Sequence, residues 1–182
     1  MKLNYKKTLK LLTLLLTSIL ISFVSAATYS ELYMKATPIT IGAADLKFVN
    51  GANTTSIGSV NAAGTEAVFD GMSVDPGQTI TYEQAVNITN GAGSTKTLNM
   101  SLYSITGNFS TNFDYINVTI IAANGTSLGS NIEIVSSGPN VTSTGNIQMA
   151  DGELWTVRWI ITAKTTATEG QSTSVTLKVK VE

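Results

Sequence analysis

The side chains that supply most enzymatic nucleophiles, general bases and transition-metal ligands are missing from this sequence. Its 182 residues include no histidine and no cysteine. A Ser-His-Asp triad, a cysteine nucleophile and a zinc site of the usual type are therefore excluded. A Ser-Lys pair or a pair of carboxylates is formally open, but the acidic residues are scattered singly, as on a solvated surface. We expect no enzyme activity and rank a secreted hydrolase third among the functions considered.

Asp151 and Glu153 are the one close acidic pair, and they fall in a predicted turn before a strand. In that place they are expected to solubilise the turn rather than to catalyse a reaction. A calcium site could be built from Asp75, Asp151, Glu153 and loop carbonyls, because Ca²⁺ takes oxygen ligands of this kind. Nothing in the spacing requires such a site, so we predict no metal and no cofactor.

Seven Asn-x-Ser/Thr sequences, none with proline in the middle, are candidate N-glycosylation sites. Three lie on predicted strands, on the face opposite the apolar residues, and four lie in predicted loops. All seven side chains are therefore predicted to be accessible. Polar residues face solvent in any case, so the pattern fits bound glycans and a plain polar surface equally well. The seven are Asn53, Asn87, Asn99, Asn108, Asn117, Asn124 and Asn140.

Residues 1–26 have the pattern of an export signal. Four lysines precede a 14-residue apolar run at 11–24, which is short for a membrane span and close to a signal-peptide core. Small residues follow, so cleavage after Ala26 and secretion are predicted, with an uncleaved anchor as the alternative. The 156 residues that remain suit one domain.

The net charge of the secreted chain limits the classes of partner that it is expected to bind. Cleavage removes the four lysines and leaves 7 basic against 12 acidic residues, a net charge of −5. Nucleic acids and anionic membranes need a basic face, so neither is expected as a partner. Because the chain has no cysteine, a secreted domain must be held together by core burial, strand pairing or assembly.

Apolar and polar residues alternate along several segments, which turn signals separate about every ten residues. Clear strands are predicted at 79–89, 98–102, 115–120, 155–161 and 174–181, and shorter ones at 45–49, 66–69 and 132–135. Loops are predicted at 50–64, with one short strand inside it, and at 136–146. The turn at 90–93 predicts a hairpin between the strands on either side. The pattern predicts one all-β domain at 39–182, an antiparallel, jelly-roll-like β-sandwich.

Residues 27–38 precede this domain as a strand-like N-terminal arm. One face of the arm is apolar and consists of Leu32, Met34 and Ala36. Pro38 cannot donate to a strand ladder and marks a hinge. The ten residues before it, when extended, reach about 33 Å, which is enough to enter an adjacent subunit. Pairing with the chain's own sheet is the other possibility, and it is the more common one for a terminal strand.

Three stretches carry a family resemblance. ATYSELY at 27–33 directly follows the signal, IGAADLKF at 41–48 leads into an apolar strand, and PGQTITYEQAVNITNGAGSTKTLNMSLYSITG at 76–107 combines a Pro-Gly turn, a long strand, an Asn-Gly turn and a return strand. Together they resemble the TasA/camelysin-like family of secreted β-sandwich proteins, in particular the archaeal bundling-pilus subunits related to it. The resemblance covers roughly the first two-thirds of the secreted chain.

The resemblance implies a structural role. Such proteins are subunits of extracellular filaments, pili or biofilm fibres, in which the N-terminal strand of one subunit completes the sheet of the next. The partners would be further copies of the chain, joined head to tail and bundled laterally. Surface glycans are a separate expectation, which comes from the Asn-x-Ser/Thr sequences alone. Some family members are described as metallopeptidases, but this chain has no His-Glu-x-x-His. The alternative function is a cell-surface adhesin or a module that binds carbohydrate or protein. The implied donor strand consists of Ala27, Thr28, Tyr29, Ser30, Glu31, Leu32, Tyr33, Met34, Lys35, Ala36 and Thr37, with the hinge at Pro38.

Overall fold

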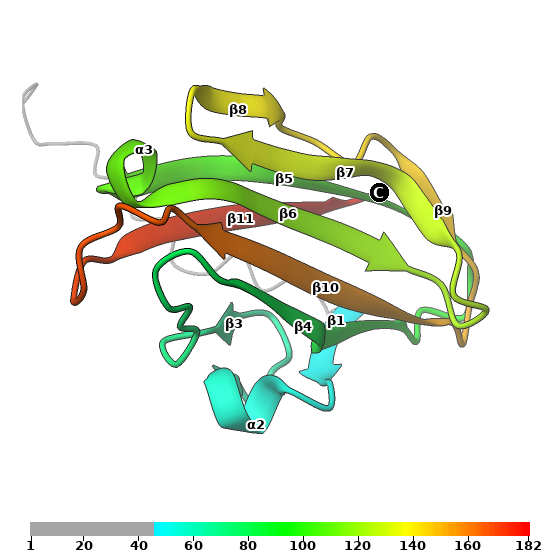
Figure 1. Cartoon of the computed structure of the whole chain (residues 1–182). Coiled ribbons are helices and arrows are strands. Elements are labelled where there is room, and N and C mark those ends of the chain that lie inside the picture. Colours follow the sequence, from blue (N-terminus) through cyan, green and yellow to red (C-terminus); the bar gives the residue numbers. More distant parts are fainter. Residues whose placement is uncertain (1–45) are drawn as a thin grey trace, which may run out of the picture. The chain divides into compact units, whose positions relative to one another are not determined.

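Two facing antiparallel sheets make up the part of the chain that the structure, a computed structural model, describes: residues 46–182 (Figure 1). One sheet has six strands in the order β1-β4-β10-β6-β7-β8, and the other has three in the order β11-β5-β9. A small third sheet pairs β2 with β3. The predicted all-β antiparallel sandwich is confirmed over this range, whereas the predicted donor strand lies outside the described residues.

The elements of the larger sheet are β1 (Leu46–Asn50), β4 (Thr79–Asn90), β6 (Phe113–Ile121), β7 (Ser127–Val135), β8 (Gly138–Val141) and β10 (Leu154–Ala163). The second sheet contains β5 (Lys96–Gly107), β9 (Ile147–Met149) and β11 (Thr173–Val181). The remaining elements are short: α2 (Thr54–Ile57), β2 (Ser59–Val60), β3 (Ala67–Val68) and α3 (Phe109–Asn112).

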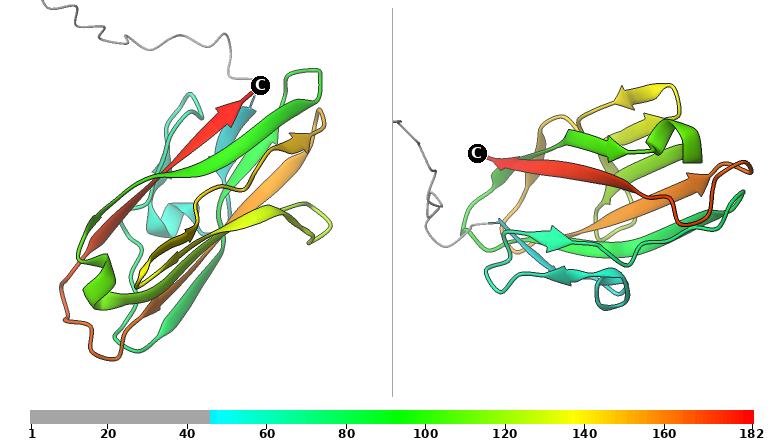
Figure 2. Two further views of the ribbon diagram at one scale, coloured as in Figure 1. Left: turned by 90° about the horizontal axis from the view of Figure 1, so that it is seen from above. Right: turned by 90° about the vertical axis from the view of Figure 1, so that its left-hand side faces the viewer.

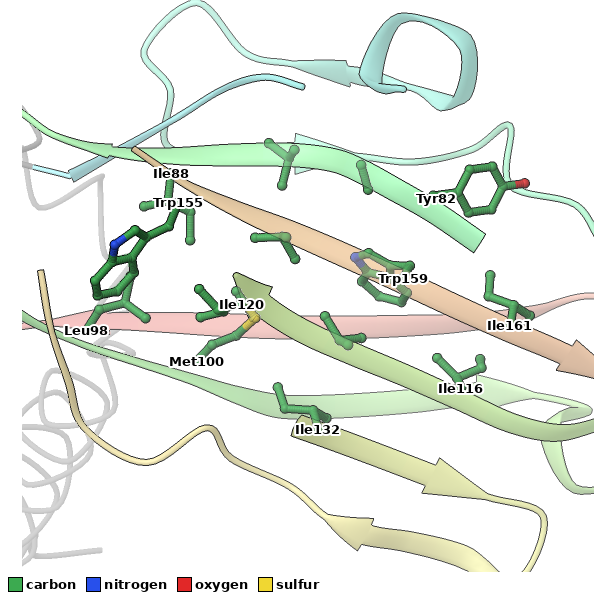
Figure 3. Close-up of a cluster of buried hydrophobic side chains, with 14 of the residues drawn as sticks. Tyr82, Ile88, Leu98, Met100, Ile116, Ile120, Ile132, Trp155, Trp159 and Ile161 are labelled. Atoms are coloured by element: carbon green, nitrogen blue, oxygen red, sulfur yellow. The ribbon is translucent and has the colours of Figure 1, made fainter. Parts of the chain in front are cut away.

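The core lies between the two sheets and is built from the inward face of each alternating strand. Val118 and Ile120 on β6 are fully enclosed, and Trp155 on β10 and Leu98 on β5 belong to the same buried cluster (Figure 3). Each fully buried side chain of this size contributes about 1.5–3 kcal/mol relative to an exposed one. A cysteine-free chain can therefore be held together by this apolar layer.

A bulge interrupts the pairing of β4 with β10. Tyr82 pairs with Trp159 and Val86 pairs with Val157, so residues 83–85 of β4 lie opposite a single residue of β10. Because two extra residues are inserted, the alternation of β4 returns to the same phase after the bulge. Gln84, the one polar residue in the inward series of the sequence pattern, is thereby exposed at the bulge.

The hairpin predicted between residues 79–89 and 98–102 is wrong. β4 pairs with β1 and β10, whereas β5 pairs with β11 and β9 in the other sheet. The intervening segment, residues 91–95, is a corner that carries the chain from one sheet to the other. Asn90 holds this corner: its Nδ2 donates to the carbonyls of Ser94 at 2.9 Å and Met149 at 2.8 Å. Alternation and turn residues identify two strands but not the sheet to which each belongs.

Local structure in two predicted loops differs from the sequence pattern. The segment 50–64 contains the one-turn helix α2 as well as the short strand β2, and 136–146 contains the strand β8. Neither α2 nor β8 exceeds four residues, which is too short for a recognisable periodicity of apolar residues in the sequence. The predicted turn at 75–77 is confirmed, because the N–H of Gln78 donates to the carbonyl of Asp75 at 3.0 Å and Gly77 has a φ of +73°.

Candidate functional site

The longest edge strand of the described domain has one side without a strand partner. β11 has nine residues and ends the three-stranded sheet, so that it pairs with β5 alone. The other outer strands are short, with five residues in β1, four in β8 and three in β9. Proteins normally keep edge strands short or covered, because free N–H and C=O groups pair with other chains. β11 is therefore the candidate site for strand addition.

An apolar groove follows the free edge of β11. Its volume is about 1200 Å³, and it lies between β11 and the segment 65–74, with Val157, Trp159 and Ile161 of β10 among its lining residues. The opposite side of the sandwich is closed, because residues 142–144 hydrogen-bond to both sheets: Leu102 N–H donates to the Thr142 carbonyl at 2.7 Å and Ser130 N–H to the Thr144 carbonyl at 2.9 Å. The described domain is thus sealed on one side and open on the other.

The inward face of β11 is incompletely covered. Val175, Leu177 and Val179 alternate toward the core, yet all three are only half-buried. The indole of Trp159 also lacks a partner: its Nε1 is buried and has no hydrogen bond within residues 46–182. A buried donor left unpaired costs about 1–3 kcal/mol. An added strand can cover the apolar residues and bring polar atoms into the groove.

The wall opposite β11 is held in place by a tyrosine. The Tyr82 hydroxyl accepts a hydrogen bond from the Ser73 N–H at 3.0 Å and donates one to the Ser73 carbonyl at 3.1 Å. The wall is also tied to α2, since the Gly71 N–H donates to the Ile57 carbonyl at 2.8 Å. Phe69 of the same wall meets the Trp159 ring edge-on, with 6.3 Å between centroids. These contacts keep the wall apart from β11 and the groove open.

Replacing Tyr82 with phenylalanine is expected to lower the free energy of unfolding by about 1–3 kcal/mol, because both Ser73 hydrogen bonds are lost at a partly buried site. Urea unfolding followed by circular dichroism measures the change. Tyr103→Phe is the matched control, since Tyr103 is 70% exposed and should change stability by less than about 0.5 kcal/mol. Equal effects of the two substitutions would show that the tyrosine does not hold the wall.

The two rims of the groove carry opposite charges. Glu66 and Asp70 lie on the wall segment, and Lys178 lies on β11. Lys178 and Lys180 both point outward from β11, on the face away from the core. The affinity of a strand that binds between these rims will depend on its own charges as well as on its apolar face. Opposite charges on neighbouring strands stabilise the pair, and like charges destabilise it.

The candidate glycosylation sites divide by accessibility. Asn108, Asn124 and Asn140 are exposed, and Asn53 and Asn99 are half-buried. The prediction that all seven side chains are accessible is wrong for Asn87 and Asn117, which are 9% and 7% exposed. Both point away from the core, but they lie on central strands of the six-stranded sheet, where neighbouring side chains cover them. The Asn117 amide, for example, donates to the Tyr115 hydroxyl at 2.7 Å. The alternation pattern predicts which face of the sheet a residue lies on, but not how far neighbouring side chains bury it.

The acidic residues are not brought together. Asp75 lies in the turn before Thr79, the first residue of β4. Glu153 lies at the other end of this strand, where its carbonyl accepts a hydrogen bond from the N–H of Asn90, the last residue of β4, at 3.2 Å. β4 is twelve residues long, about 40 Å, so a calcium site that includes Asp75 and Glu153 is excluded. The Asp151 carboxylate instead accepts from the Gly93 N–H at 2.8 Å. Residues 46–182 contain no cluster of three or more acidic side chains that could hold a metal ion.

The predicted donor residues 27–37 and the hinge Pro38 lie outside the described residues, so their placement stays a prediction. The acceptor groove was not foreseen from the sequence. The alternation at 174–181 is as regular as that of a fully covered strand, and the missing neighbour of β11 becomes evident only from the strand order. One signal was present: the outward lysines on this strand are typical of an exposed edge.

Within residues 46–182, no helix is both long enough and apolar enough to cross a bilayer. Models of known protein families and curated proteins were compared with the chain, and none matches it.

Proposed function

We propose that this protein is the structural subunit of an extracellular homopolymeric filament, a bundling pilus or biofilm-matrix fibre. In this assembly, residues 27–37 of one subunit add a strand to the free edge of β11 in the next. The observation that carries the proposal is a nine-residue edge strand bordering an apolar groove, with its inward residues only half-buried. Its occupant is a strand with an apolar face, and the N-terminal arm of another copy has that pattern.

The arm and the groove agree in length and chemistry. Eleven arm residues span about 36 Å and nine residues of β11 span about 30 Å, so the arm can cover the whole edge. Leu32 and Met34 supply large apolar side chains on alternate positions, as the alternating inward face of β11 requires. Strand addition combines backbone hydrogen bonds, which provide affinity, with side chains in pockets, which provide specificity.

This mode of pairing gives an open polymer. In this mode each subunit contributes one arm and one groove, which are different parts of the chain, so the contact is head-to-tail and can propagate without closing on itself. Binding of the arm stabilises the folded domain by mass action, which suits a chain without disulfides. The Ser/Thr/Asn-rich surface is then free for contacts between filaments.

The adhesin alternative has weaker support. Sites for small ligands usually bring a few polar groups together in an enclosed apolar pocket. The groove beside β11 is instead long and bounded by a free backbone edge, as expected for a peptide strand. A strand from another protein would fit the same edge, and the experiment below distinguishes that case.

The proposal is tested by electron microscopy of the secreted form, residues 27–182. The unmodified protein is expected to form filaments, and deletion of residues 27–37 should abolish them. Met34→Asp should also abolish them, because it places a charge on the face that enters the groove. Tyr33→Asp is the matched control: it introduces the same charge one residue away on the opposite face, and filaments should persist.

Filaments that persist after the deletion would overturn strand exchange by the arm. A monomer at all concentrations, with a groove that binds peptides from other proteins, would support the adhesin alternative. Equal loss of filaments in the Met34 and Tyr33 variants would show that the arm does not insert with the predicted face.

A further inference from the structure

We propose that the incoming donor strand runs antiparallel to β11, with Leu32 of one subunit opposite Leu177 of the next. This inference rests on the proposed function and specifies the orientation, register and owner of the strand. Three features decide it: the inward residues of β11, the charges on the outward faces, and the number of residues that link the arm to β1.

The apolar faces restrict the register to steps of two residues. Val175, Leu177 and Val179 point into the groove, so the residues opposite them must come from the face of the arm that carries Leu32 and Met34. With Leu32 opposite Leu177 in the antiparallel orientation, Met34 lies opposite Val175. Both large arm residues then cover the half-buried part of β11.

The same register pairs the charges favourably. On the outward faces, Glu31 lies opposite Lys178 and diagonal to Lys180, and Lys35 lies opposite the uncharged Ser174. Opposite charges across two strands stabilise the pair, and like charges destabilise it. Sliding the arm by two residues, so that Met34 meets Leu177, makes Lys35 diagonal to Lys178. In the Leu32–Leu177 register, Lys35 lies opposite Ser174, which is two outward positions away from Lys178 on β11.

No parallel register satisfies both requirements. Placing Glu31 opposite Lys178 carries Met34 to Val181, which is 42% exposed at the end of β11. Moving Met34 back to either of the next two inward positions sets Lys35 opposite a lysine. Placing Met34 opposite Val175 instead sets Glu31 opposite residue 172, which precedes the first residue of β11. The antiparallel orientation is therefore favoured by apolar contact and charge together.

The orientation also identifies the owner of the strand. Leu46 pairs with Asn90, next to the corner that leads into β5, and Val181 pairs with Leu98 just past that corner. The start of β1 and the C-terminal end of β11 thus lie at the same end of the sandwich (Figure 2). An antiparallel arm ends at the opposite end, near Thr173.

The link between arm and domain leaves almost no slack for an antiparallel arm to fill its own groove. Nine Cα–Cα steps, through residues 38–45, join Thr37 to Leu46 and extend to at most about 32 Å. In this register Thr37 lies opposite residue 172, so the return to the level of Val181 alone requires about 30 Å, and the chain must also turn and cross from β11 to β1. The antiparallel strand in each groove therefore belongs to another copy of the chain, whereas a parallel strand could come from the same copy.

Disulfide trapping tests the inference cleanly because the chain has no cysteine of its own. The antiparallel register places Tyr33 opposite Thr176, with Cβ atoms about 5 Å apart, close to disulfide geometry. Tyr33→Cys with Thr176→Cys should give an oxidised ladder of linked subunits on a non-reducing gel, with loss of most of the monomer band. Tyr33→Cys with Lys180→Cys, the parallel pair, should stay monomeric on the same gel, because these positions are about 13 Å apart in the antiparallel register.

The outcomes separate this inference from the proposed function. The orientation would be overturned if a ladder formed with the Tyr33→Cys/Lys180→Cys pair and not with the Tyr33→Cys/Thr176→Cys pair. The register would be overturned if a ladder formed with Tyr33→Cys/Lys178→Cys in place of Tyr33→Cys/Thr176→Cys. A fast-migrating monomer with an internal disulfide would overturn the assignment to another copy. In each case filaments seen by microscopy would leave the proposed function standing, whereas absence of filaments from the unmodified protein would remove it.

Discussion

Mixing two assembly-defective variants is expected to give dimers and no filaments. Leu177→Asp places a charge in the groove and leaves the arm intact, so this subunit can donate but not accept. Met34→Asp has the opposite defect, since it can accept but not donate. In a mixture, the intact arm enters the intact groove once, and the dimer then carries only a defective arm and a defective groove. Size-exclusion chromatography with light scattering should show monomers for each variant alone and a heterodimer for the equimolar mixture.

The mixing result follows from the pairing of one arm with one groove. A symmetric dimer that exchanges both arms would also give a heterodimer in the mixture, but its unmodified protein would stop at dimers, whereas head-to-tail association gives filaments. Thr176→Asp is the control for charge on the acceptor strand, because Thr176 is an exposed neighbour of Leu177 and alternates with the inward residues of β11. This variant should still form filaments. Recovery of filaments in the mixture would contradict one arm and one groove per subunit.

The alternation of apolar residues predicted most of the sandwich because burial depends on which face a residue occupies. The inward series on β10 illustrates this: Trp155, Val157, Trp159 and Ile161 are all buried. The strand order could not be predicted in the same way. Two strands that each bury one face obey the same pattern whether they pair with each other or lie in opposite sheets, as β4 and β5 do.

The groove shows the same limit at the level of function. Leu177 has the sequence environment of a covered core residue, and its partial exposure results from a strand that the described domain lacks on that side. The sequence supplied the arm, with an apolar face and a hinge, but not the place where it docks. The structure supplies the free edge of β11. The proposed filament joins a donor read from the sequence with an acceptor read from the fold.

The edge of β11 balances assembly against aggregation. A long free edge with an apolar inward face would pair with many strands, but Lys178 and Lys180 on its outward side disfavour a partner with lysine at the facing positions. Two copies of β11 side by side would bring these lysines close together in most registers. Charge on the outward face thus selects among strands that the apolar groove alone would accept.

Replacing Asn90 with alanine is expected to cause the largest loss of stability of any single polar substitution proposed for the described domain. The side chain is 1% exposed, and its Oδ1 also accepts a hydrogen bond from the Ala92 N–H at 3.0 Å. With the bonds to Ser94 and Met149, three backbone groups at the corner between the sheets depend on it. Leaving such groups unpaired should lower the free energy of unfolding by about 3 kcal/mol or more, which corresponds to a fall in Tm of about 10 °C.

Thermal and urea unfolding in the Met34→Asp background, where assembly adds no stability, measure this loss. Asn124→Ala is the matched control: Asn124 is exposed and makes one side-chain bond, accepting from the Thr126 N–H at 3.0 Å. It should cost less than about 1 kcal/mol. Similar losses in both variants would mean that the corner is held by its backbone and by the packing of Leu98 and Trp155. A selective loss at Asn90 would explain physically why the chain crosses between the sheets at this point, because the amide that ends β4 is also bonded to β9 in the opposite sheet.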